Sequence, residues 1–115
     1  RMGNRLTQAT IEYYPPEIFI DVARPAMDVF ALGITLYVLL TRRNDRPDLQ
    51  AMDDAFKCYI NGDTNCVIQK VEEAKRLLAS WDPQVPEPYK SLIKKMTDPD
   101  PAKRPTALDV VKALA

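Results

Sequence analysis

Residues 27–41 read MDVFALGITLYVLLT, and this stretch decides the fold class of the chain. Asp28 is a suitable N-cap for a helix, because its carboxylate can accept hydrogen bonds from the free amides of the first turn. A helix built from the residues behind it would be apolar on nearly every side, through Val29, Phe30, Leu32, Ile34, Leu36, Tyr37, Leu39 and Leu40. Other protein has to surround such a helix. The stretch therefore predicts a central, buried helix capped by Asp28.

Shorter helices are predicted on both sides of this central helix. Pro16 suits the first turn of a short helix over residues 16–19. The pair Asn61-Gly62 is a turn signal that ends a predicted helix over residues 53–60. Apolar side chains also recur at helical spacing over residues 67–79 and over residues 89–96.

The last predicted helix begins behind Thr106, which forms a capping-box-like pair with Asp109. Its apolar face is predicted to consist of Leu108, Val111 and Leu114. No stretch alternates convincingly between apolar and polar residues with the period of two that a half-buried strand needs. The pattern predicts a single all-α domain of five or six helices.

Composition excludes several classes of function. The chain has 115 residues, 46% of them hydrophobic, with 16 Lys plus Arg against 16 Asp plus Glu. This balance gives no field that would attract nucleic acid or an anionic membrane, and no apolar run approaches the roughly 20 residues that span a bilayer. The polar amino terminus has no signal-peptide pattern. We expect an intracellular, cytoplasmic protein in which Cys58 and Cys66 are free thiols rather than a disulfide.

The residues show no evident catalytic machinery of their own. The chain has no histidine, so Ser80, Ser91 and the two cysteines lack the usual activating base. Its three glycines are too sparse for a phosphate-binding loop. The acidic pairs at residues 53–54 and 72–73 are typical of solvated helix faces. No metal site and no cofactor site is predicted in these residues.

Three separated segments, in order, resemble the lower half of the C-terminal lobe of eukaryotic protein kinases. They read TIEYYPPE at residues 10–17, MDVFALGITLYVLL at 27–40 and LIKKMTDPDPAKRPTALDVV at 92–111. They stand at the Ala-Pro-Glu motif, at the Asp-Val-Trp-Ser-Leu-Gly signature of helix F, and at the end of helix H through helix I. The resemblance implies an all-α C-lobe fragment without an N-lobe. Residues 1–19 would then end the activation segment and residues 20–115 would form helices F to I.

The resemblance also implies structural roles for three charged residues. In the family, the motif glutamate pairs with the arginine before helix I, and these positions are Glu17 and Arg104. A forked guanidinium suits a partly buried carboxylate. Asp28 would accept backbone amides of the catalytic loop, in addition to acting as a cap. One departure is RRNDRPDL at residues 42–49, where the family usually has Gly-x-x-Pro-Phe.

A substrate-binding role is implied for residues 10–13. Thr10 and Tyr13 match the Thr-x-x-Tyr-x-Ala-Pro-Glu spacing of serine/threonine kinases. Thr10 would lie near the catalytic base and the substrate hydroxyl. Ile11, Glu12 and Tyr13 would line the pocket for the residue that follows the phosphoacceptor. Val38 stands where many basophilic kinases carry a glutamate that reads a substrate arginine, so a strong arginine preference by that route is not expected.

Kinase catalysis needs motifs that these residues do not contain: the Gly-rich loop, the strand lysine, the His-Arg-Asp loop and the Asp-Phe-Gly magnesium ligand. ATP and Mg²⁺ are therefore expected for a full kinase domain and not for this fragment. The expected partners are a protein substrate and the missing N-terminal part of the domain. Without that part, exposed apolar surface would favour self-association. The alternatives are a pseudokinase or truncated kinase-like scaffold that only binds proteins, and an unrelated helical bundle in which Glu17 and Arg104 would lie apart.

Overall fold

The structure is a computed structural model that describes residues 11–115. Within this range it contains helices and connecting loops and no strand, which confirms the predicted all-α class. The elements are, in chain order, η1 (Pro16–Phe19), α2 (Pro25–Thr41), α3 (Leu49–Ile60), α4 (Thr64–Ala79), α5 (Tyr89–Met96), η2 (Pro101–Lys103) and α6 (Ala107–Leu114).

Helix α2 begins at Pro25, four residues earlier than a cap at Asp28 implies. Arg24 is its N-cap residue, and Asp28 lies in the first turn without a side-chain capping bond. The prediction of Asp28 as the N-cap is therefore wrong. Proline fits the first position of a helix, because its ring presets the helical φ angle and it has no amide to leave unpaired. The helix ends at Thr41, and its C-cap residue, Arg42, adopts a left-handed conformation with φ 63°.

One side of α2 faces the core and the other side is open. Phe30 and Ile34 are 0% exposed, whereas Leu39 is 61% and Leu32 is 47% exposed. The expectation that protein surrounds this helix on every side is therefore not met by the described residues. The buried side packs mainly against α5, and Gly33 permits the close approach, since a Cβ atom there would lie 2.8 Å from Met96 Cβ.

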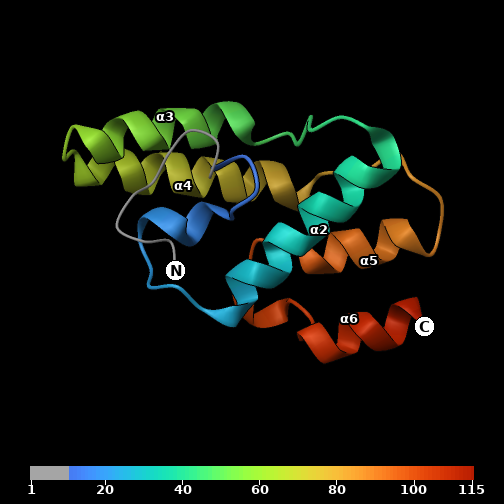
Figure 1. Ribbon diagram of the computed structural model, residues 1–115. Helices are drawn as coiled ribbons and strands as arrows, with labels where there is room; N and C mark the ends of the chain where they lie inside the picture. Colours follow the sequence, from blue (N-terminus) through green and yellow to red (C-terminus); the bar gives the residue numbers. More distant parts are fainter. Residues whose placement is uncertain (1–10) are drawn as a thin grey trace.

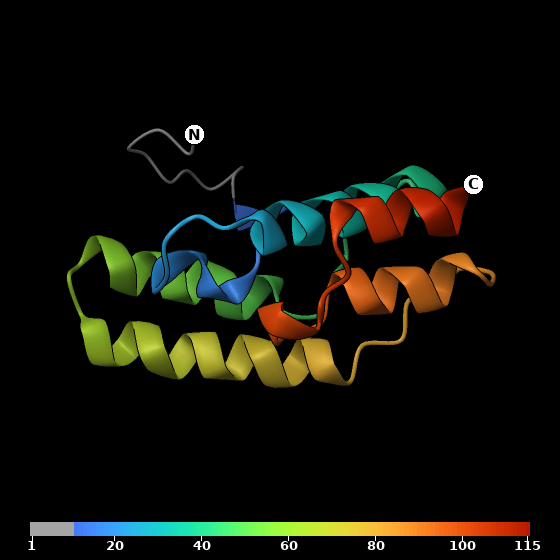
Figure 2. The same cartoon turned by 90° about the horizontal axis from the view of Figure 1, so that it is seen from below.

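Helices α3 and α4 form an antiparallel hairpin beside this pair, and η1 lies against both of them (Figures 1 and 2). The predicted turn at Asn61-Gly62 connects the two helices, and Gly62 supplies its positive φ of 71°. Their apolar faces bury residues such as Met52, Ala55 and Val71, which form one cluster with Ile18 and Phe19 of η1. The hairpin thus holds the segment that precedes α2.

The two cysteines are bonded in the structure, so the prediction of free thiols is not met. Cys58 lies in the last turn of α3 and Cys66 in the first turn of α4, and their Cα atoms are 5.8 Å apart. The hairpin turn brings the two helix ends together within the usual span of a disulfide. Spacing along the chain alone did not reveal this proximity.

Helix α6 has the predicted capping box. The Thr106 hydroxyl accepts from the Asp109 amide at 3.1 Å, and the Asp109 carboxylate accepts from the Thr106 amide at 3.2 Å. Its predicted apolar face is not buried: Leu108 and Val111 are 61% and 62% exposed, and the helix buries Val110 instead. Across residues 11–115, no helix has the length and apolar character needed to cross a bilayer.

Candidate functional site

A buried ion pair joins η1 to the loop between η2 and α6. Arg104 donates from Nη1 to Glu17 Oε2 at 2.6 Å and from Nη2 to Glu17 Oε1 at 3.1 Å. Both side chains are almost fully buried. This bidentate geometry is the strong form of an arginine–carboxylate contact. It fixes the end of the segment 11–17 to the far end of the chain, 87 residues away in sequence.

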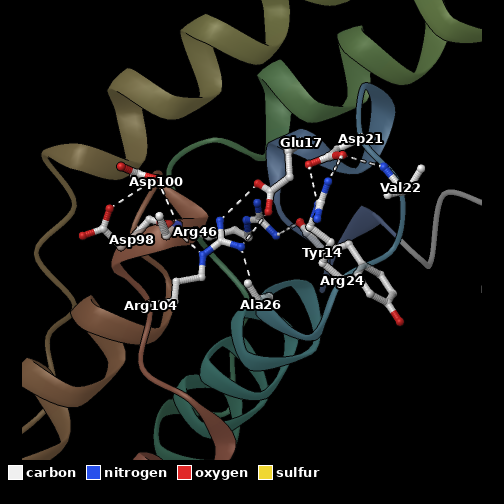
Figure 3. A network of polar contacts seen from close by, with 11 residues as sticks. Tyr14, Glu17, Asp21, Val22, Arg24, Ala26, Arg46, Asp98, Asp100 and Arg104 are labelled. Atoms are coloured by element: carbon white, nitrogen blue, oxygen red, sulfur yellow. Dashed lines mark hydrogen bonds and ion pairs between the residues drawn. The ribbon is translucent and has the colours of Figure 1, made fainter.

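Arg104 also satisfies backbone groups of two other segments. Its Nε donates to the Asp98 carbonyl at 2.9 Å and its Nη1 to the Ala26 carbonyl at 3.1 Å. The guanidinium lies 4.9 Å from the ring centroid of Phe30. One side chain therefore ties together η1, the start of α2 and the loop behind α5, as Figure 3 shows.

A second buried arginine, Arg46, lies next to this pair, and sequence reasoning missed it. Arg46 and Asp48 are both 0% exposed in their side chains and form a bidentate pair with two contacts of 2.6 Å. Arg46 Nη1 also donates to backbone carbonyls of the segment 11–14, including that of Tyr14 at 2.9 Å. The only available signal was a charged loop between two apolar helices, and loop charges are usually solvated.

The loop that carries Arg46 is itself held at its surface side. The Tyr37 hydroxyl donates to Asp45, and Arg43 Nε donates to the same carboxylate at 2.9 Å. The Tyr37 hydrogen bond, followed by the Arg43 contact, lowers the pKa of Asp45, whereas burial and the Asp45 contact raise the pKa of Tyr37. Asp45 is therefore ionised at neutral pH and remains an acceptor for both donors.

The residues expected to bind substrate lie in different environments. Thr10 falls outside the described residues. Ile11 is 2% exposed and belongs to the core, while the Glu12 side chain is exposed and Tyr13 is half-buried against the cluster around Phe30. Among residues 11–13, only the last two thus offer side-chain surface to a ligand.

Asp28 lies on the surface, near the amino-terminal end of α2. It lines a hollow between this end and the start of α6, together with Leu32 and Pro105. An exposed carboxylate here can accept hydrogen bonds from a neighbouring segment. The structure does not bring Asp28 next to the segment 11–13 through any contact that it records.

The arrangement consists of buried anchoring contacts. Residues 11–115 contain no cluster of three or more metal-ligating side chains. The chain has no histidine to move a proton and no glycine-rich loop to hold phosphates. The buried ion pairs instead hold a non-helical segment, residues 12–15, against an all-helical base.

Anchors of this kind hold an irregular segment against a helical base, and comparisons with known proteins give the family of the chain. A family model described as "Protein kinase domain" matches residues 4–114. The chain belongs to the protein kinase domain family, so the predicted kinase resemblance is confirmed.

The chain is similar to serine/threonine-protein kinase ArnS of Sulfolobus acidocaldarius, with 36% identity over 123 residues that cover 99% of this chain and 20% of that protein. It is also similar to calcium-dependent protein kinase 8 of Oryza sativa subsp. japonica, with 33% identity over 97% of this chain and 19% of that protein. A Wee1-like protein kinase of the same rice is 31% identical over 87% of this chain and 16% of its own length. The chain thus spans 16–20% of the length of these relatives. No solved structure matches it significantly.

Proposed function

We propose that this chain is the substrate-docking half of the C-lobe of a serine/threonine protein kinase. The whole protein would transfer the γ-phosphate of ATP to serine or threonine of a protein substrate, with ATP and Mg²⁺ held by parts outside these residues. The observation that carries the proposal is the buried Glu17–Arg104 pair. It anchors the residues directly behind the expected docking segment to the base of the lobe.

The helices have an assignment within this proposal. Residues 1–19 would be the end of the activation segment, and residues 20–115 would comprise helices F to I. Helix α2 would be helix F, α3 helix G, α5 helix H and α6 helix I. Helix α4 would then be an addition to the link between helices G and H. The order and the spacing of the three sequence segments support this assignment.

Serine/threonine specificity is supported by two independent observations. Thr10 and Tyr13 stand at the spacing before Glu17 that is typical of this class. One of the similar proteins is itself named a serine/threonine-protein kinase. The docking residues would be Thr10, Glu12 and Tyr13, with Ile11 anchoring the segment from inside the core. Asp28 would hold the catalytic loop.

The exposed apolar side of α2 supports a further part of the proposal. Leu32, Leu39 and Leu40 are each more than two-fifths exposed. The remaining part of the kinase domain would cover this side, and a chain without that part would self-associate through it. The balanced charge supports a protein partner rather than nucleic acid or a membrane. An intracellular, cytoplasmic location, where ATP is available, completes the proposal.

A phosphotransfer assay on the full-length protein tests this function. The protein is incubated with labelled ATP, Mg²⁺ and three peptide pools in which serine, threonine or tyrosine is the sole acceptor. Transfer to the serine and threonine pools is expected, and residues 1–115 alone should transfer nothing. Transfer to tyrosine only would contradict the proposal. Tight peptide binding without any transfer would instead identify a pseudokinase scaffold.

A further inference from the structure

We propose that Arg46, oriented by Asp48, is a positioning residue that sets the backbone of the substrate-docking segment 11–14. This inference rests on the proposed function, because it concerns how that same segment is held. It adds a residue from the loop between α2 and α3, where RRNDRPDL replaces the usual family sequence. We expect Arg46 to affect how strongly the kinase discriminates between substrates that differ in the residue after the phosphoacceptor.

One nitrogen of Arg46, Nη1, lies within hydrogen-bond distance of three backbone carbonyls of segment 11–14. Nη1 lies 3.4 Å from the Ile11 carbonyl, 3.3 Å from the Glu12 carbonyl and 2.9 Å from the Tyr14 carbonyl. Asn44, in the same loop, donates from Nδ2 to the Glu12 carbonyl at 3.0 Å. The segment forms no strand or continuing helix that would satisfy these carbonyls, so the loop side chains take the place of backbone partners.

The Arg46 guanidinium has little freedom to move. Nε and Nη2 both bind the Asp48 carboxylate at 2.6 Å, and neither side chain is exposed. The guanidinium also lies 4.8 Å from the ring centroid of the fully buried Phe30. The Arg104 guanidinium lies at 4.9 Å from the same ring, so Phe30 contacts both anchoring arginines. The contacts with Asp48 and Phe30 therefore fix the orientation of the guanidinium and the direction in which Nη1 points.

The held backbone determines where the side chains of the segment go. Ile11 points into the core, which leaves Glu12 exposed and Tyr13 half-buried at the surface. A pocket edge formed by Glu12 and Tyr13 would be preformed, and a substrate would not have to order it on binding. Preorganisation of this kind improves affinity, because the ordering cost is already met in the free protein.

A lysine cannot reproduce this arrangement. Its single ammonium group is a point charge, whereas arginine directs separate N–H groups at a carboxylate and at other acceptors in one plane. Stability alone is a weak reason for a buried ion pair, since well-packed apolar residues are often equally stable. The hydrogen bonds from Arg46 to three carbonyls therefore indicate that the Arg46–Asp48 pair controls the conformation of segment 11–14.

The test compares variants of the full-length kinase on peptides that differ only in the residue after the acceptor. Arg46→Lys should raise the KM for peptide by about tenfold, the order expected when a loop must be ordered on binding. It should also reduce the discrimination between the peptides and leave the KM for ATP unchanged. Lys57→Met is the control, because Lys57 is exposed and pairs with Asp53 rather than with segment 11–14 or with the loop that carries Arg46.

Each result decides the matter. If Arg46→Lys lowers kcat and the melting temperature at unchanged peptide KM and unchanged discrimination, Arg46 is only structural and the inference is overturned, while the proposed function stands. If Arg46→Lys does not fold, the double variant Arg46→Met, Asp48→Leu replaces it, since it leaves no unpaired buried charge, and the same KM effect is expected. If the wild-type protein transfers no phosphate to any peptide, the proposed function fails, and this inference fails with it.

Discussion

Replacement of Arg104 by methionine should cost about 3–5 kcal/mol of the free energy of unfolding. The side chain makes four hydrogen bonds, two of them to Glu17 and one each to the Asp98 and Ala26 carbonyls. Methionine fills a similar space but leaves the Glu17 carboxylate, whose residue is 4% exposed, without its cation. Since domains are stable by only about 5–15 kcal/mol, Arg104→Met should bring the chain close to unfolding.

A double-mutant cycle measures this loss in the free energy of unfolding, with circular dichroism reporting unfolding in urea. Glu17→Leu combined with Arg104→Met removes both charges and should cost about 2 kcal/mol less than the sum of the single variants. Lys57→Met is the control: it removes an exposed partner of Asp53 and should change stability by less than about 0.5 kcal/mol. The reasoning would be refuted if the losses in the free energy of unfolding of Glu17→Leu and Arg104→Met were additive. It would also be refuted if Arg104→Met cost no more than the control.

Three further predictions concern packing, pH and association. Gly33→Ala should lower the free energy of unfolding by about 1–3 kcal/mol in the same urea assay, because the added Cβ would lie 2.8 Å from Met96 Cβ. An unchanged urea midpoint of unfolding would contradict the close packing of α2 on α5. Hydrogen bonds from the backbone and side chain of Thr106 lower the pKa of Asp109 below its ordinary value, so the stabilising effect of this carboxylate is present at neutral pH and is lost as the pH falls through the lowered pKa. Asp109→Asn should therefore reduce the acid-dependent loss of melting temperature in thermal melts between pH 7 and pH 3, and an unchanged loss would contradict the role of the capping box. Residues 1–115 should self-associate through the exposed apolar side of α2, and light scattering should show a lower apparent mass for Leu39→Glu than for the wild type. A wild-type chain that is a monodisperse monomer at high concentration would contradict self-association through this surface.

Several helices were predictable because they have a strong local signal in the sequence. Apolar periodicity marked α4 and α5, and the Thr106–Asp109 capping box marked the start of α6. The start of α2 was misplaced, because Asp28 and Pro25 are both good start signals and the proline prevailed. Where two local signals compete, the sequence alone does not rank them.

Burial and loop contacts were less predictable, because they depend on which elements meet. The apolar stripe of α6 suggested a buried face at Leu108 and Val111, but no described segment covers it. Arg46 looked like a solvated loop charge until the fold placed it beneath the segment 11–14. The pairing of Glu17 with Arg104 was expected from the family resemblance, and no local pattern links residues so far apart.

The proposed docking role depends most directly on where the substrate touches the kinase. A peptide substrate that carries a photoreactive phenylalanine directly after the acceptor can be cross-linked to the full-length protein and mapped by mass spectrometry. The structure-based proposal predicts cross-links within residues 10–13 of this chain, at the segment held by Arg46 and by the Glu17–Arg104 pair. Cross-links that fall only outside these residues would contradict it.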